Sequence, residues 1–219
     1  MNINILTKEQ VNFLELISKS ELFSNYYLSG GTALVGYYYP YRYSDDLDFF
    51  TEVEIDNITI LSFLKTNKNK IGYIEFDIKI INNRNLFFLN FADGYQLKVE
   101  FTYYPFTQIE KSIQHNNLKI DSIVDIAVNK IFTIYQNPRT RDFTDIYTIL
   151  SDKKLNINDL ISMAKIKFDW HVDKFQLGKR FRSFGADIDK PRYVVDFPIG
   201  KCRDFFTTES KRLGLSVIE

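Results

Sequence analysis

Two aspartates, Asp46 and Asp48, alternate with apolar residues in a stretch that has the pattern of a β-strand, residues 46–50. Side chains of a strand point alternately to its two faces, so both carboxylates emerge on one face while Leu47 and Phe49 point to the other. Two carboxylates that share an edge of a buried sheet repel each other and lose hydration unless a cation lies between them. Magnesium is typically bound by one or two carboxylates, several water molecules and the phosphates of a substrate. The acid pair therefore predicts a metal site.

A glycine turn precedes the acid pair. A short apolar strand signal at residues 26–28 runs into Ser29, Gly30, Gly31 and Thr32, followed by a small-residue turn or helix. Because glycine has no side chain, the backbone can turn sharply here and direct its N–H groups at phosphate oxygens. Each feature alone is common, since most Gly-Gly pairs form turns and most Asp-x-Asp triplets lie in solvated loops. In this order they predict a site for a metal-bound nucleoside triphosphate.

A third carboxylate lies on a strand expected at residues 97–104. Lys98 and Glu100 are two positions apart, so they share one face of that strand. An exposed pair of opposite charges is the ordinary explanation of such a pattern. Because the strand follows the Asp-x-Asp strand, Glu100 is alternatively a third metal ligand.

A lysine and two further aspartates lie on two expected helices. From Asp121 the apolar residues recur with helical period, and Lys130 lies at the margin of their stripe. Its side chain can extend to water, or it can enter a cleft where a compact cation would offset triphosphate charge. Asn137-Pro138 ends this helix and Thr140 is expected to cap the next. Asp142 and Asp145 lie along one edge of that next helix, where first-turn acids often only complement the helix dipole.

The glycine turn and the acid pair resemble the DNA polymerase β-like nucleotidyltransferase superfamily, which is marked by G-G or G-S, a spacer and D-x-D. In particular, GGTAL followed by RYSDDLDFF resembles the AbiEii/AbiGii toxin branch. The resemblance covers residues 25–150 and includes a helix bearing Lys, then Arg, then R/K-D-x-x-D. Those positions are Lys130, Arg139, Arg141, Asp142 and Asp145. The chain departs from the family pattern at Glu100, because the family usually has Lys-x-Asp at this point.

The resemblance implies that a nucleoside monophosphate is transferred from a nucleoside triphosphate such as ATP to an acceptor, with release of pyrophosphate. Asp46 and Asp48 would hold two Mg²⁺ (or Mn²⁺) ions, with Glu100 completing the acceptor-side metal site. Asp145, and Asp142 with it, would orient Lys130 or the acceptor. The implied nucleotide-binding residues are Gly30, Gly31, Thr32, Lys98, Lys130, Arg141 and Asp142.

Partners also follow from the resemblance. Several family members are toxins of toxin–antitoxin or phage-defence pairs, and some modify tRNA 3′ ends, which implies tRNA as acceptor and a cognate antitoxin as partner. The alternative acceptors are a small hydroxylated molecule or a protein hydroxyl. A non-catalytic module that binds nucleotide for regulation is the alternative of a different class.

The composition is that of an ordinary globular protein, with 45% hydrophobic and 26% charged residues and a formal net charge of +0. Charge is uneven along the chain: residues 45–56 hold six acids and no base, and residues 165–212 hold 12 basic and seven acidic residues. This pattern suits a protein that holds metal in one place and an anionic partner in another, although ordinary solvated surface explains it equally well.

The single cysteine, Cys202, excludes an internal disulfide, and with two histidines far apart a zinc cluster is not expected. Without a signal sequence or a long apolar run, we expect a cytoplasmic protein with no membrane partner.

The periodicities predict an α/β (α+β) fold, a small mixed twisted sheet backed by helices, and a mostly helical C-terminal region. The change of period places a domain boundary between a nucleotidyltransferase core, 1–118, and a region that completes the cleft, 119–219. The expected elements are a helix opened by a Thr7–Gln10 capping box, a helix at 58–70, a half-buried strand at 73–81, strands at 86–91 and 97–104, and a helix at 157–168. Bases and aromatics interleave at 174–192, which can follow an RNA backbone or be ordinary amphipathic packing.

Overall fold

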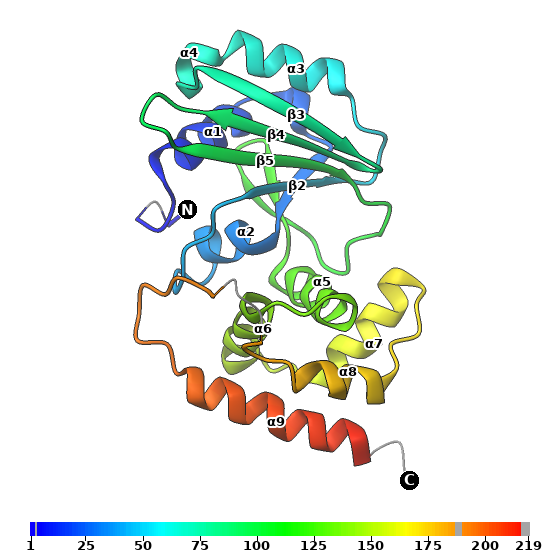
Figure 1. Cartoon of the computed structure of the whole chain (residues 1–219). Coiled ribbons are helices and arrows are strands. Elements are labelled where there is room, and N and C mark those ends of the chain that lie inside the picture. Colours follow the sequence, from blue (N-terminus) through cyan, green and yellow to red (C-terminus); the bar gives the residue numbers. More distant parts are fainter. Residues whose placement is uncertain (3, 187–189, 216–219) are drawn as a thin grey trace. The chain divides into compact units, whose positions relative to one another are not determined.

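The computed structural model of the chain describes residues 1–2, 4–186 and 190–215 (Figure 1). The chain divides into two compact units, Met1–Ser122 and Ile123–Glu219. Among the described residues, none of the helices has both the length and the apolar composition that a bilayer crossing needs.

A mixed β-sheet forms the centre of the first unit. Within the described residues it has seven strands in the order β3-β4-β5-β2-β1-β7-β6 (Figure 1). The pairs β2–β5 and β1–β7 are parallel, and the other neighbours are antiparallel. The strands are β1 (Tyr26–Ser29), β2 (Leu47–Thr51), β3 (Glu75–Ile81), β4 (Arg84–Asn90), β5 (Gln96–Tyr103), β6 (Ile113–His115) and β7 (Leu118–Ile120). The expected α/β architecture with a mixed sheet is confirmed.

The helices of the first unit follow local signals in the sequence. They are α1 (Lys8–Ser18), the 3₁₀ turn η1 (Glu21–Phe23), α2 (Gly30–Tyr37), α3 (Asn57–Thr66) and α4 (Lys68–Ile71). The capping box is confirmed, since Thr7 and Gln10 exchange side-chain and backbone hydrogen bonds at the start of α1. The single helix expected at 58–70 is wrong. Asn67 leaves helical geometry and its Nδ2 donates to the Phe63 carbonyl, so α3 ends and α4 begins there.

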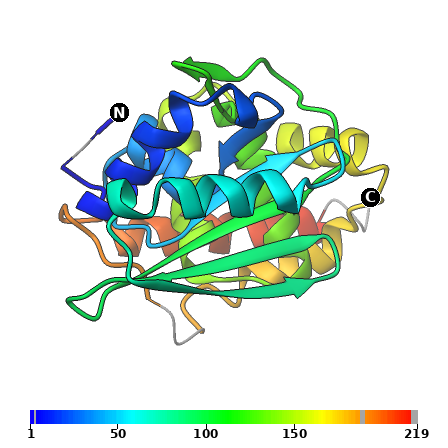
Figure 2. The same ribbon diagram turned by 90° about the horizontal axis from the view of Figure 1, so that it is seen from above.

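Aromatic side chains pack α1 and α3 onto one face of this sheet. Phe13 of α1 lies 6.1 Å from Phe49 of β2 and 6.2 Å from Phe63 of α3, between ring centroids. Phe49 stacks on Phe101 of β5 at 5.1 Å. Figure 2 shows α3 lying over the sheet, roughly along the direction of its strands. Since Phe49 faces these helices, the alternation of β2 directs Asp48 to the opposite face.

The predicted half-burial of strand β3 is wrong. The expected strand is present, but its apolar residues are not buried: Ile78 and Ile80 are both exposed. The physical reason is that β3 lies at the edge of the sheet, so it has a neighbouring strand on one side only. Phe76 alone among the residues of β3 is half-buried, against Phe87 of β4.

The second unit is helical throughout the elements that the structure describes, as expected. Its helices are α5 (Ile123–Gln136), α6 (Thr140–Asp152), α7 (Ile157–Phe168), α8 (Lys174–Phe181) and α9 (Ile199–Leu215). Within this unit α5 contacts α6, α7 and α8, and α9 packs on α8 and α6. The expected cap of α6 by Thr140 is wrong. Thr140 is the first residue of the helix, and Arg139 occupies the cap position without a side-chain cap bond.

The segment 174–192, where bases and aromatics interleave, packs some of its aromatic residues against helices and leaves its described basic residues exposed. Phe181 and Phe184 contact Phe206 of α9 at 5.0 Å and 6.2 Å between ring centroids. Arg180 donates to the Tyr135 and Gln136 carbonyls at the end of α5. Residues 187–189 of this segment lie outside the described residues.

Candidate active site

The Asp48 carboxylate lies against the backbone of Gly30. The antiparallel register of β1 and β2 places Ser29 opposite Asp48. Gly30 follows with a φ of 69°, in the left-handed region that glycine adopts without steric cost. A Cβ atom added to Gly30 would lie 2.6 Å from Asp48 Oδ2. Only glycine therefore allows this acid to approach the first residue of α2 so closely.

Asp46 is fixed at the same end of α2. The Thr32 hydroxyl, one turn into α2, donates to the backbone carbonyl of Asp46. The Asp46 carboxylate in turn accepts from Lys98 Nζ at 2.8 Å. Burial alone would lower the pKa of Lys98, but the hydrogen bond and the charge of Asp46 outweigh it and raise that pKa. The structure thus brings together five of the predicted positions: Gly30, Thr32, Asp46, Asp48 and Lys98.

The N-terminus of α2 is not capped by its own N-cap side chain. Ser29 occupies the cap position but makes no cap bond, because its hydroxyl donates to Asp121 Oδ2 at 2.7 Å. Asp121 is fully buried and also accepts from Gln108 at 2.7 Å, so the Ser29 hydroxyl is held away from α2. The first N–H groups of a helix carry partial positive charge and suit an anion such as phosphate.

Two residues beside Gly31 were not predicted from the sequence. A Cβ atom added to Gly31 would lie 2.7 Å from Ser44 Oγ and 2.8 Å from Arg42 Nη2. Arg42 is buried, and its Nη1 donates to the Tyr43 carbonyl at 2.8 Å. A guanidinium therefore stands at the glycine turn. The signal was the Arg-x-Ser that directly precedes the acidic residues in the sequence.

Glu100 lies directly opposite Asp48 in the parallel β2–β5 register. Both of its oxygens bind Arg84, with Nε to Oε1 at 2.5 Å and Nη2 to Oε2 at 2.7 Å, and the Thr102 hydroxyl donates to Oε1 at 2.8 Å. Lys98 Nζ is 3.6 Å from Oε2. Burial alone would raise the pKa of Glu100, but the hydrogen bonds from Arg84 and Thr102 and the two cationic charges hold it below its usual value. Sequence reasoning missed Arg84, which follows two asparagines in the β3–β4 turn.

Asp46 and Asp48 provide two carboxylates that fit a divalent ion, and the third acid of this site, Glu100, has both of its oxygens bonded to Arg84. In the part of the chain that the structure describes, no group of three or more Asp, Glu, His or Cys residues is arranged to hold a metal. Asp46 and Asp48 supply the number of carboxylates that magnesium usually takes. Glu100 as a metal ligand stays a prediction, and it requires Arg84 to release at least one carboxylate oxygen.

Three further predicted residues, Lys130, Asp142 and Asp145, form a buried ion cluster in the second unit. Lys130 Nζ donates to Asp142 Oδ1 at 2.9 Å and contacts Asp145 Oδ2. Arg139 adds a bidentate bond to Asp142, with Nε to Oδ2 at 2.7 Å. Burial alone would raise the pKa of Asp142, but the charges of Lys130 and Arg139 hold it below its usual value. Arg141 is half-buried in the first turn of α6. Two aspartates thus fix the position of Lys130.

Solved structures with this fold define its class. The chain aligns with the crystal structure of a candidate nucleotidyltransferase from H. pylori, with a TM-score of 0.59, 20% identity, and 98% of this chain and 99% of that chain covered. It aligns equally with JHP933 from Helicobacter pylori, with a TM-score of 0.59, 20% identity, and 96% and 94% covered. The fold is therefore that of a nucleotidyltransferase.

Sequence comparison identifies the family. Residues 12–197 match the model of the nucleotidyl transferase AbiEii toxin family, type IV TA system. The chain is also 30% identical over 167 residues to an uncharacterized protein of Aquifex aeolicus (strain VF5), which covers 74% of this chain and 76% of that relative. The chain belongs to the AbiEii nucleotidyltransferase family. The resemblance stated from the GGTAL and RYSDDLDFF motifs is confirmed, and the protein is a nucleotidyltransferase.

Proposed function

We propose that this nucleotidyltransferase moves a nucleoside monophosphate from a nucleoside triphosphate to an acceptor hydroxyl, with a divalent metal ion held by Asp46 and Asp48. The observation that carries the proposal is the approach of the Asp48 carboxylate to Gly30, where a Cβ atom would lie 2.6 Å from Oδ2. Metal-binding acids and a helix N-terminus suited to phosphate meet at this point. A triphosphate whose oxygens also bind the metal ion needs the acids and the helix N-terminus to lie within a few ångströms of each other.

Mg²⁺ or Mn²⁺ fits the chemistry of these side chains. Carboxylate oxygens are suitable ligands for both ions. Lys98 Nζ lies 2.8 Å from the Asp46 carboxylate, and its positive charge offsets the negative charge of Asp46, as a divalent ion would. When bound, the ion would lower the pKa of the attacking hydroxyl and stabilise charge on the leaving pyrophosphate.

The protein groups position the triphosphate. The N–H groups of Gly30 and Gly31 and the Thr32 side chain would contact its phosphates, and Lys98 would turn from Asp46 towards a phosphate oxygen. The acceptor hydroxyl releases its proton to solvent and its oxygen forms a bond to the α-phosphorus, while the bond from that phosphorus to the bridging oxygen of pyrophosphate breaks. Donors fixed before the reaction stabilise the charge that moves onto pyrophosphate without further reorganisation. Arg84, held by Glu100, is a further cation on this face of the sheet.

The buried cluster of the second unit supplies the other proposed cation. Lys130 would offset triphosphate charge, and its bonds to Asp142 and Asp145 support a role for both acids in orienting it. Arg141 on the same helix as these acids is a proposed nucleotide contact. A lysine held by two buried carboxylates has a fixed position, which favours electrostatic stabilisation by a charge that is already in place.

We propose tRNA as the acceptor, ATP among the donors, and a cognate antitoxin as partner, in the cytoplasm and in a phage-defence setting. The family description, a type IV TA system, supports the antitoxin. On the second unit, exposed Phe175 with Lys179 Nζ 4.4 Å from its ring centroid supports contact with RNA, since bases stack on aromatics and phosphates attract lysine.

The test is a labelling assay with each of the four α-labelled triphosphates, total tRNA, and Mg²⁺ or Mn²⁺. Wild-type protein should label tRNA, and Asp46→Asn should abolish labelling while its melting temperature is unchanged. Glu54→Gln, an exposed acid of the same acidic segment, is the matched control and should retain full activity. If the label appears in a small-molecule or protein fraction instead, the acceptor is a small molecule or a protein and not tRNA. Nucleotide binding without label in any fraction would contradict the proposal and favour a regulatory module.

A further inference from the structure

The edge strand β3 exposes an apolar row. Ile78 and Ile80 are 43% and 64% exposed, and Ile74 just before the strand is 52% exposed. Proteins usually protect such an edge with proline, a bulge, a very short strand or charged side chains, and β3 carries three charged residues beside its exposed isoleucines. In β3, seven residues pair with β4 in continuous register from Glu75 to Ile81, and none is proline. A strand of this length with exposed isoleucines is a template for pairing with another strand.

The sequence of β3 is complementary to itself. In a two-fold antiparallel pair, residues of the same face lie opposite each other, so the axis passes beside one residue of the strand. With the axis at Ile78, Asp77 faces Lys79 of the second copy twice, and Phe76 faces Ile80 twice. An axis at Lys79 would instead place two lysines opposite each other, and an axis at Asp77 would place two aspartates opposite each other between two Glu75–Lys79 pairs. Opposite charges and apolar pairs directly across two strands are stabilising, and like charges are destabilising.

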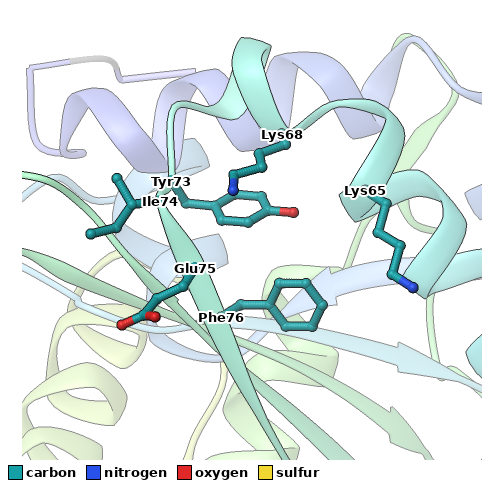
Figure 3. A pocket seen from close by; sticks show the side chains of 6 residues that line it. All are labelled: Lys65, Lys68, Tyr73, Ile74, Glu75 and Phe76. Atoms are coloured by element: carbon teal, nitrogen blue, oxygen red, sulfur yellow. The ribbon is translucent and has the colours of Figure 1, made fainter.

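A surface hollow at the start of β3 fits the same register. It has a volume of about 440 Å³ and is lined by Lys65, Lys68, Tyr73, Ile74, Glu75 and Phe76 (Figure 3). Lys68 Nζ lies 5.8 Å from the centroid of the Tyr73 ring, so a cation and an aromatic ring lie side by side in this hollow. The axis at Ile78 brings Ile80 of the second copy opposite Phe76, which lines this hollow. The most exposed isoleucine of the strand thereby gains an apolar neighbour.

We propose that β3 is a homodimer interface, in which two copies of this chain pair their β3 strands antiparallel about Ile78 and continue the sheet from one copy into the other. The interface uses neither the acid pair nor the glycine turn, so it stands apart from the proposed catalytic role. Its specificity lies in the Asp77–Lys79 pairs, and its apolar contact lies in Phe76, Ile78 and Ile80.

The test measures molar mass by sedimentation equilibrium over a range of concentrations. Wild-type protein should be a dimer at micromolar concentration. Asp77→Lys and Lys79→Asp each place two like-charged pairs across the interface and should raise the Kd at least tenfold. The double variant D77K/K79D exchanges the charges, restores both pairs, and should return the Kd to within about threefold of wild type.

A matched control uses the other edge of the sheet. Ile78 on β3 and Ile113 on β6 are both 43% exposed on edge strands. Ile78→Lys should give a monomer, whereas Ile113→Lys should remain a dimer, with circular dichroism confirming that both variants are folded. A monomeric wild-type protein at 100 µM would overturn the proposal, and so would a dimer whose Kd is the same in Asp77→Lys and in the double variant.

Discussion

Gly30 is the residue at which the geometry of the site can be tested by adding one methyl group. In Gly30→Ala the new Cβ atom would lie 2.6 Å from Asp48 Oδ2, and ordinary contact begins at 3.4 Å. The carboxylate must therefore retreat by about 0.8 Å. A displacement near 1 Å in a positioned group costs on the order of 100-fold in rate. The alanine would also have to adopt the left-handed conformation, at a cost of about 1 to 2 kcal/mol in stability.

Gly94 separates these two effects. It has a φ of 84°, and a Cβ atom added there would have no neighbour within 4 Å. Gly94→Ala therefore carries the conformational cost without a collision. We expect both variants to lose similar thermal stability, and only Gly30→Ala to lose nucleotidyl transfer, by about 100-fold in kcat/KM with labelled triphosphate. Equal activity in the two variants would refute the close approach of Asp48 to the glycine turn.

Three further predictions concern the second unit. Lys130→Met should destabilise the protein by about 3 to 5 kcal/mol, because it removes the cation that contacts two buried carboxylates, Asp142 and Asp145. Urea unfolding measures this loss, and a smaller loss than in Asp142→Asn would contradict the ion cluster. The pKa of Asp142 is lower folded than unfolded, so its stabilisation is present above about pH 4 and is lost as pH falls through the folded pKa. Melting temperature should therefore fall more steeply below pH 4 in wild type than in Asp142→Asn, and equal slopes would contradict the shift. Burial raises the pKa of Cys202 to about 12. A thiol reagent should therefore modify Cys202 only at the rate of unfolding. Rapid modification of the native protein would show that α9 is not packed as described.

The sequence predicted the elements whose signals are local. The Thr7–Gln10 capping box and the alternation of β2 each depend on a few neighbouring residues, and both are present in the structure. The motifs that identify the family are also contiguous stretches. Their identity therefore did not depend on knowing the strand order.

What the sequence could not predict depends on the order of the strands. An alternating pattern at residues 73–81 indicates a half-buried strand, yet β3 is exposed because it lies at the sheet edge. Arg84 reaches Glu100 only because β4 pairs with β5 in a register that sets Arg84 opposite Thr102. Likewise Lys130 was placed at the margin of its helix, and the packing of α5 against α6 buries it between two acids.

The central claim is that Asp46 and Asp48 together hold a divalent ion against a triphosphate. Electron paramagnetic resonance of free Mn²⁺, titrated with protein and a non-hydrolysable triphosphate, measures that binding directly. We predict saturable Mn²⁺ binding in wild type and an affinity at least tenfold weaker in Asp48→Asn, with Glu54→Gln unchanged. Equal Mn²⁺ affinity in wild type and Asp48→Asn would contradict the claim.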